Sequence, residues 1–338
     1  MRRVDIPRLF GLAAVILGGG CVAAWANDSS AELSVGGLTF KQTPDVSMES
    51  EELTISADNI IVRYRFLNQS AAPVTLTVGF PLPDIDLADA DNIAFPTSDP
   101  VNFVGFQTKV DGKPINFNIV QRAMLGEKNV SQAIRDAGLQ LLPLGNYQEQ
   151  IAALPANVRD KLINDGLLMP AGSDERGQTI YGGTWVVKTS VVRQQTFPPG
   201  KPVAVEHRYK ASVGVTFDTV LRKAIRESSG MAKEFERYRT EYCVPDELLR
   251  AIDKIAGNAE ANTAKFREQR ISYILKTGAN WAGPIKDFRL VVDKGKPDRL
   301  VSFCADNVKK ISPTQFEMRA TDFTPQRDLK VLIIDRRS

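Results

Sequence analysis

Long stretches of this chain alternate apolar and polar side chains, which is the period of a β-strand with one buried side and one solvent-facing side. Residues 60–66 and 74–80 alternate on either side of a polar loop, and residues 203–210 alternate in the same way. Asp111-Gly112 lies between two further alternating runs and predicts a hairpin. Because such strands must bury their apolar side against another layer, we expect antiparallel sheets packed face to face.

The pattern turns helical in two places. Residues 130–167 contain short helical runs, where Pro155 suits a first helical turn and Gly166 a helix end, and residues 217–255 are also predicted to be largely helical. We therefore predict a mainly-β fold with helical insertions (α+β), built as two packed antiparallel β-sandwich-like units. The predicted units are residues 27–215, a β-sandwich-like domain with a helical insertion at about 121–177, and residues 216–338, an α+β unit that ends in strands.

The first 26 residues have the organisation of an export signal. Three arginines precede an apolar run at residues 9–17, and Ala24-Trp25-Ala26 is a typical cleavage site. We expect cleavage after Ala26 and a periplasmic or secreted protein. Lipidation of Cys21 is the alternative, although Gly18 stands where a lipoprotein signal usually has an aliphatic residue. No later segment has 18 consecutive apolar residues, so no transmembrane segment is expected in the mature chain.

Charge and composition exclude several classes of function. The 338-residue chain carries a formal net charge of only +3 and includes one histidine. A net positive charge this small gives little support for nucleic-acid binding, which requires many cationic side chains to displace the counterions of phosphates. One histidine excludes a multi-histidine metal site and the HExxH motif of metalloproteases. The motifs GxSxG, GxGxxG and the Walker loop are also absent from the sequence.

Two cysteines, Cys243 and Cys304, remain after removal of the leader. In an oxidising compartment two cysteines most simply form one disulfide, and we predict that bond here. A reactive thiol pair or a metal site is the alternative, and no CxxC motif supports either.

Four aromatic residues are candidates for ligand contacts. Trp281 lies in a glycine-rich loop and Trp185 on a predicted strand, where each either stacks on a sugar or peptide or, as we favour, packs in the interior. His207 and Tyr209 share one face of an alternating strand. A packed core histidine is the preferred interpretation of His207, with a catalytic base or a ligand contact as alternatives.

An acidic run follows a proline-rich segment. Its carboxylates, Asp84, Asp86, Asp89 and Asp91, could converge on Ca²⁺, the one cofactor that the sequence suggests. The spacing is not that of an EF-hand. A solvated loop whose aspartates cap turns is the favoured interpretation, and the Ca²⁺ site is the alternative.

Several short motifs follow one another in a fixed order along the chain. They are Met48-x-x-Glu51-x-Leu53-x-Ile55, Val62-x-Tyr64-x-Phe66-x-Asn68, Phe80-Pro81-Leu82-Pro83, Phe197-Pro198-Pro199 with His207-x-Tyr209, residues 277–285, Ser302-Phe303-Cys304 and Asp322-Phe323-Thr324-Pro325. In this order they resemble an exported bacterial family, the domain of unknown function 4424, over essentially the whole mature chain. The resemblance implies bacterial export and a single architecture, and it implies no activity, cofactor or catalytic residue.

Three functions fit these observations. The first is a non-enzymatic periplasmic or envelope protein that binds an envelope protein or a glycan through its loops and helical insertion. The second is a hydrolase that uses Asp and Glu on envelope polysaccharide or peptide, and the third is a structural module stabilised by calcium at residues 84–91. An enzyme is expected to show a pocket with two carboxylates in different environments. A binding module is expected to show an exposed apolar or aromatic patch.

Overall fold

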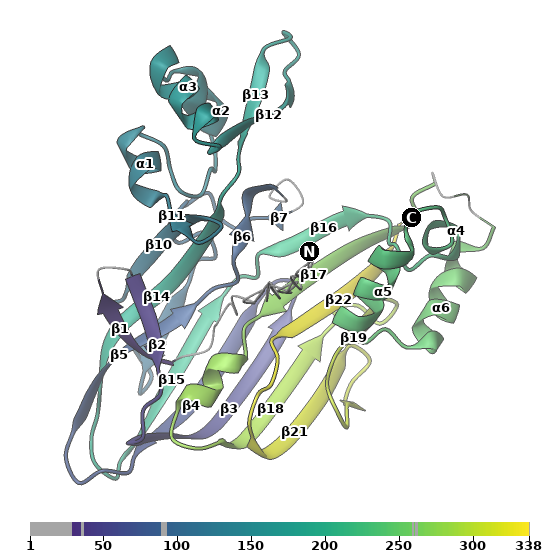
Figure 1. Cartoon of the computed structure of the whole chain (residues 1–338). Coiled ribbons are helices and arrows are strands. Elements are labelled where there is room, and N and C mark those ends of the chain that lie inside the picture. Colours follow the sequence, from purple (N-terminus) through teal and green to yellow (C-terminus); the bar gives the residue numbers. More distant parts are fainter. Residues whose placement is uncertain (1–28, 35–36, 89–92, 259, 261–262, 338) are drawn as a thin grey trace, which may run out of the picture.

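The computed structural model describes residues 29–34, 37–88, 93–258, 260 and 263–337, and it confirms a mainly-β protein with helical insertions (Figure 1). The expected leader, its cleavage site after Ala26, and Cys21 lie outside the described residues. Within these ranges, no helix combines the length and the apolar character that a membrane crossing would need.

The largest sheet of the described residues has eight strands, and it confirms the alternation that the sequence predicted. Val62, Tyr64 and Phe66 of one strand point into the core, while Arg63 and Arg65 between them are exposed. The strands, in spatial order, are β20 (Lys309–Lys310), β21 (Gln315–Phe323), β18 (Ile285–Asp293), β3 (Val46–Ser56), β4 (Ile60–Asn68), β15 (Pro202–Tyr209), β8 (Gln107–Val110) and β9 (Lys113–Pro114).

The centre of this sheet differs from the antiparallel arrangement that was expected. Strand β18 pairs with β3 in parallel, with Leu290 opposite Leu53, whereas the other neighbours in this sheet are antiparallel. A parallel pair needs a long crossover, and more than half of the chain separates these two strands. Strands from both sides of residue 215 therefore share one sheet, so the predicted boundary does not coincide with a break in the sheet.

A second sheet, of seven strands, packs across the core from the first. Strand β14, the longest, lies at its centre and pairs with β10, β5 and β6. The strands are β11 (Lys128–Asn129), β10 (Asn118–Leu125), β14 (Val186–Phe197), β5 (Val74–Pro81), β1 (Ser29–Ser34), β2 (Gly37–Lys41) and β6 (Ile85–Asp86).

A five-stranded sheet separates the main core from a layer of helices. Its residues alternate: Ile271 and Val331 belong to the main core, whereas Phe266 and Leu332 pack against the helices. The strands, in spatial order, are β19 (Leu300–Phe303), β22 (Leu329–Arg336), β17 (Phe266–Tyr273), β16 (Val213–Phe217) and β7 (Ile93–Ala94). The helices are α4 (Lys223–Arg226), α5 (Ala232–Glu241) and α6 (Asp246–Ala256), and a 3-10 helix, η2, spans Lys276–Asn280.

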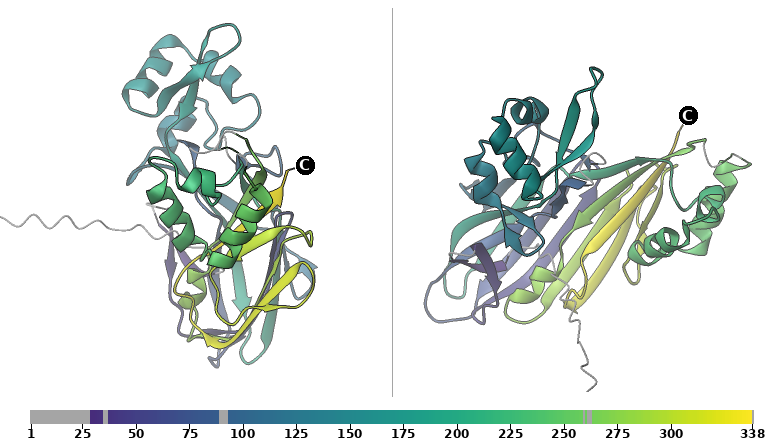
Figure 2. Two further views of the ribbon diagram at one scale, coloured as in Figure 1. Left: turned by 90° about the vertical axis from the view of Figure 1, so that its right-hand side faces the viewer. Right: turned by 45° about the horizontal axis from the view of Figure 1, so that its top comes forward.

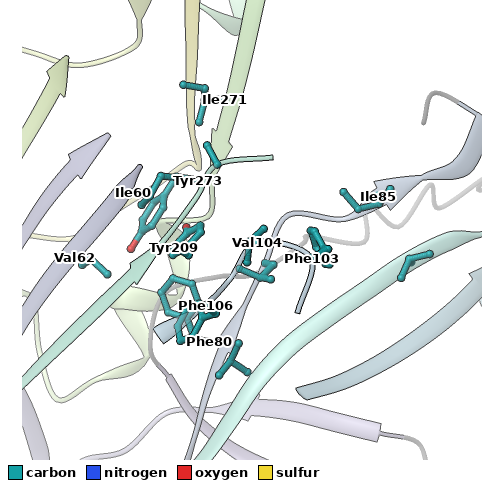
Figure 3. Close-up of a cluster of buried hydrophobic side chains, with 14 of the residues drawn as sticks. Ile60, Val62, Phe80, Ile85, Phe103, Val104, Phe106, Tyr209, Ile271 and Tyr273 are labelled. Atoms are coloured by element: carbon teal, nitrogen blue, oxygen red, sulfur yellow. The ribbon is translucent and has the colours of Figure 1, made fainter. Parts of the chain in front are cut away.

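One aromatic core joins the three sheets (Figure 3). The ring of Phe80, on β5, lies 5.8 Å from that of Tyr209 on β15 and 6.3 Å from that of Tyr273 on β17. The hydroxyl of Tyr273 lies 3.2 Å from the hydroxyl of Tyr64 on β4. Because this core is continuous, the three sheets form one folded body.

The helical insertion projects from one end of the sheets (Figures 1 and 2). It comprises α1 (Ser131–Asp136), α2 (Tyr147–Ala152), α3 (Ala156–Asn164) and a hairpin of β12 (Leu168–Ser173) and β13 (Thr179–Gly183). The expected range of 121–177 was too wide at its start, where residues up to 129 form β10 and β11. Its end is β-hairpin rather than helix.

Candidate functional site

The four aromatic candidates lie in the interior. Trp185 and His207 are 0% exposed, and Trp281 and Tyr209 are 3% exposed. The ring of Trp281 packs 4.4 Å from that of Phe66, and Trp185 donates a hydrogen bond from Nε1 to the carbonyl of Leu141 at 2.8 Å. The favoured interpretation, packing in the interior, describes both tryptophans, and these residues form no surface on which a ligand could stack.

His207 lies among aromatic side chains of the core. Its ring centroid is 5.0 Å from that of Phe106, 5.1 Å from Phe80 and 5.8 Å from Tyr64. This environment corresponds to the packed core histidine that the sequence favoured. A buried ring of this kind cannot reach a substrate at the surface.

The acidic run is only partly within the described residues. Asp84 forms an ion pair with Lys188 at 2.7 Å, and Asp86 accepts a hydrogen bond from the backbone N–H of Ala88. Asp89 and Asp91 lie outside the described residues. Among the residues that are described, no three acidic, cysteine or histidine side chains group as metal ligands. The calcium site stays a prediction.

Cys243 and Cys304 form the predicted disulfide. Cys243 follows the end of α5 by two residues and Cys304 follows β19 directly. Close by, the hydroxyl of Ser302 donates a hydrogen bond to the carbonyl of Tyr242 at 2.9 Å. The bond therefore fixes the end of α5 to the edge of the five-stranded sheet.

A polar hollow of about 370 Å³ lies between α5 and the five-stranded sheet, and we refer to it as the basin. The strand register places four lining residues on its floor, because Arg270 of β17 lies opposite Gly214 of β16 and Ser272 lies opposite Lys330 of β22. The helical period forms its wall, because residues 234, 237 and 241 recur on one face of α5 and Tyr242 directly follows the end of that helix. The charged residues that line it are Asp84, Glu234, Arg237, Glu241, Arg270 and Lys330.

The charges on the helix side of the basin neutralise one another. Arg237 donates hydrogen bonds to Glu234 and to Glu241, each at 2.5 Å, and Lys330 forms an ion pair with Glu241. The hydrogen bond from Arg237 lowers the pKa of Glu234. Burial lowers the pKa of Lys330.

Arg270 is held differently from these cations. Its Nη1 donates a hydrogen bond to the hydroxyl of Tyr238 at 2.7 Å and lies 3.6 Å from Oε1 of Glu268. A quarter of its side chain is exposed. Gly214 makes room for it, since a Cβ at that position would lie 3.0 Å from Nε of Arg270. The guanidinium therefore lies along the floor of the basin, anchored by a phenol.

Glu268 is a buried carboxyl beneath this arrangement, with its side chain 1% exposed. Its Oε1 accepts hydrogen bonds from the hydroxyl of Tyr238 at 2.8 Å and from that of Thr216 at 3.3 Å. Burial raises the pKa of Glu268, and burial raises the pKa of Tyr238 to about 12. Burial therefore disfavours the charged form of both groups.

We expect Glu268→Gln to remove a pH dependence of stability. Because the pKa of Glu268 is raised in the folded state, its stabilising contribution is complete below the ordinary pKa of 4.5 and is lost as the pH rises through the raised value. The unfolding free energy of the wild type should therefore fall relative to that of the variant as the pH increases. Urea denaturation at a series of pH values measures this, and a constant difference across the series would contradict it.

Sequence reasoning missed Glu268 and Arg270, although a signal was present. Residues 266–273 alternate, with Glu268, Arg270 and Ser272 on one face and Ile271 and Tyr273 on the other. A polar face on a strand near two predicted helices indicates a covered polar surface. The pattern does not show which helix covers that surface.

A larger hollow, of about 530 Å³, lies on the outer face of the eight-stranded sheet. Its charged side chains are mostly exposed, as in the pair of Arg63 with Glu206 at 2.7 Å, where Arg63 is 53% exposed. Exposed pairs of this kind hold their geometry weakly. In the basin, Arg270 is anchored by the buried side chains of Tyr238 and Glu268, and we therefore take the basin as the candidate site.

Fold and basin together define a disulfide-bonded, mainly-β protein with a polar hollow under a helix. A model of the family described as Domain of unknown function (DUF4424) matches residues 26–332, and the chain belongs to that family. A comparison with curated proteins finds no match.

Solved structures show distant likeness. A protein from Legionella pneumophila, for which a nutrient-binding role is proposed, aligns over 91% of this chain and 70% of its own, with 15% identity and a TM-score of 0.43. An M1 zinc metallopeptidase from Deinococcus radiodurans aligns over 87% of this chain and 43% of its own, with 8% identity and a TM-score of 0.22. Likeness at this level carries no argument about activity.

Proposed function

We propose that this chain is an exported, non-enzymatic envelope protein that binds a small polar ligand or a polar group of a partner in the basin. Export is supported by the basic and apolar sequence that precedes the predicted cleavage site at Ala26 and by the disulfide, since such bonds persist in oxidising compartments. A volume of about 370 Å³ is within the range of small-molecule sites.

The observation that carries the proposal is the position of Arg270. This guanidinium lies in the basin, donates to a buried phenol and lies 3.6 Å from the buried Glu268, whereas the other basin cations form closer pairs with carboxylates that line the basin. Arginine offers five donors in a fixed plane, so one anchored donor leaves others that can meet a ligand. Convergent, preorganised polar groups in a hollow are typical of a ligand site.

The charges also favour binding over hydrolysis. The carboxylates that line the basin, Asp84, Glu234 and Glu241, each pair with a lysine or an arginine. A hydrolase with two carboxyl groups needs one that keeps a proton and one that is free to act on the substrate. The carboxyl with the raised pKa, Glu268, is buried under Tyr238 and Thr216 and does not line the basin.

We expect Ser272→Trp to abolish ligand binding while the fold is kept, because Ser272 is an exposed residue on the basin floor and an indole there fills the hollow. Thr321→Trp is the matched control, since Thr321 is exposed on a strand, β21, that does not line the basin. Native mass spectrometry of protein purified from the periplasm should show a bound mass on the wild type and on Thr321→Trp. That mass should be missing from Ser272→Trp. The same bound mass on all three proteins, or none on any, would contradict the proposal.

A further inference from the structure

We infer that the basin recognises an anionic group, a carboxylate or a phosphate, and that Arg270 is its principal contact. This inference rests on the proposed function, because it names the chemistry of a ligand in the same hollow.

Most charged side chains around the basin form ion pairs with one another or with a neighbour. Asp84 is neutralised by Lys188 at 2.7 Å, and Glu234 and Glu241 are neutralised by Arg237 and Lys330. These pairs leave one further charge among the described lining residues, the positive charge of Arg270. A hollow with one surplus cation attracts one anionic group.

The carboxyl nearest to Arg270 belongs to a buried side chain. Glu268 approaches the guanidinium at 3.6 Å, and its Oε1 is occupied by the hydroxyls of Tyr238 and Thr216. Burial favours its protonated form. The contact at 3.6 Å is longer than a hydrogen bond, and the exposed quarter of the Arg270 side chain remains open to the basin that it lines.

The geometry around Arg270 also favours an anion. The hydroxyl of Tyr238 donates to Glu268 and accepts from Arg270, which holds one nitrogen of the guanidinium in place. Ser212 and Ser272 line the same hollow and can donate to the oxygens of an anion. Gly214 lets the guanidinium lie close to the strand. A planar guanidinium flanked by hydroxyls suits the bidentate recognition of a carboxylate or a phosphate.

The test is an NMR titration of the mature, disulfide-bonded protein with inorganic phosphate and with succinate, using glucose as the neutral probe. Both anions should shift the backbone amides of Gly214 and Ser272, and glucose should not. We expect Arg270→Gln to weaken binding of the anions by about tenfold or more, as for the loss of a charge-assisted hydrogen bond. Arg270→Lys should recover part of the affinity, because it keeps the charge without the planar fork.

Two further variants test whether the effect depends on the position of Arg270 or only on the loss of a positive charge. Arg319→Gln removes an exposed arginine on β21 and should leave the titration unchanged. Gly214→Ala should weaken anion binding without unfolding the protein, because its methyl group displaces only the end of a flexible side chain. Sedimentation with phosphatidylglycerol vesicles distinguishes the source of the anion. If the wild type binds the vesicles and Arg270→Gln does not, the anion is a lipid headgroup. If the wild type does not bind vesicles but shows the expected shifts in the NMR titration, the anion is a free one.

Two results would overturn the inference. One is the absence of shifts at Gly214 and Ser272 with either anion, and the other is equal anion affinity in the wild type and Arg270→Gln. A bound mass that Ser272→Trp removes and Arg270→Gln leaves in place would retain the proposed function and reject the anionic ligand. A bound mass that neither variant changes would reject both.

Discussion

Replacing Cys243 and Cys304 together by alanine should lower the unfolding free energy by about 4 kcal/mol. The two cysteines are 61 positions apart, and cutting their bond frees a long loop in the unfolded chain. The gain in chain entropy of the unfolded state is the physical reason for the loss. Urea denaturation of the oxidised wild type and of the double variant measures the difference as a shift in midpoint at a similar slope.

A reductant provides the control for this prediction. It should lower the urea midpoint of the wild type to that of the double variant and leave the double variant unchanged. Ligand binding should also weaken in the reduced protein, because the disulfide holds the end of α5, which forms a wall of the basin. Equal midpoints for the oxidised wild type and the double variant would show that this bond does not stabilise the fold.

Trp185→Ala should cost about 3–5 kcal/mol of unfolding free energy, as is typical of a large aromatic side chain removed from a core. Trp185 is 0% exposed, and its Nε1 donates to the carbonyl of Leu141 at 2.8 Å. The substitution leaves a cavity where β14 meets the helical insertion and also leaves that carbonyl without its donor. Thermal or urea denaturation measures the loss.

Trp185→Phe is the matched variant, because it keeps an aromatic ring and removes the hydrogen bond. It should destabilise the protein less than Trp185→Ala does. Neither variant should change anion binding beyond what partial unfolding explains, since Trp185 does not line the basin. A normal stability of Trp185→Ala combined with a loss of ligand binding would assign this residue to a binding surface instead.

Local patterns in the sequence predicted most of the individual elements. Alternation in β4 and β15 predicted which side chains enter the core, and it placed His207 and Tyr209 on the same face. Helix α6 follows its apolar stripe, in which Leu248, Leu249 and Ile252 are buried against the five-stranded sheet. Two remaining cysteines predicted the disulfide. These features depend on neighbouring residues or on simple counting, so one sequence is sufficient to find them.

Features that depend on distant segments could not be predicted in this way. The parallel pairing of β3 with β18 joins residues more than 200 positions apart, and neither strand carries a local sign of its partner. The basin likewise depends on the register of Gly214 with Arg270 and on the placement of α5 above them. Glu268 and Arg270 become notable only once Tyr238 is known to lie between them.

The central claim is that the basin is the ligand site of an exported protein, and a crystal structure of the protein purified from the periplasm tests it most directly. The account predicts a bound non-protein group in the basin, with an oxygen within hydrogen-bond distance of the guanidinium of Arg270. A ligand bound elsewhere on the molecule, with only water beside Arg270, would contradict the account.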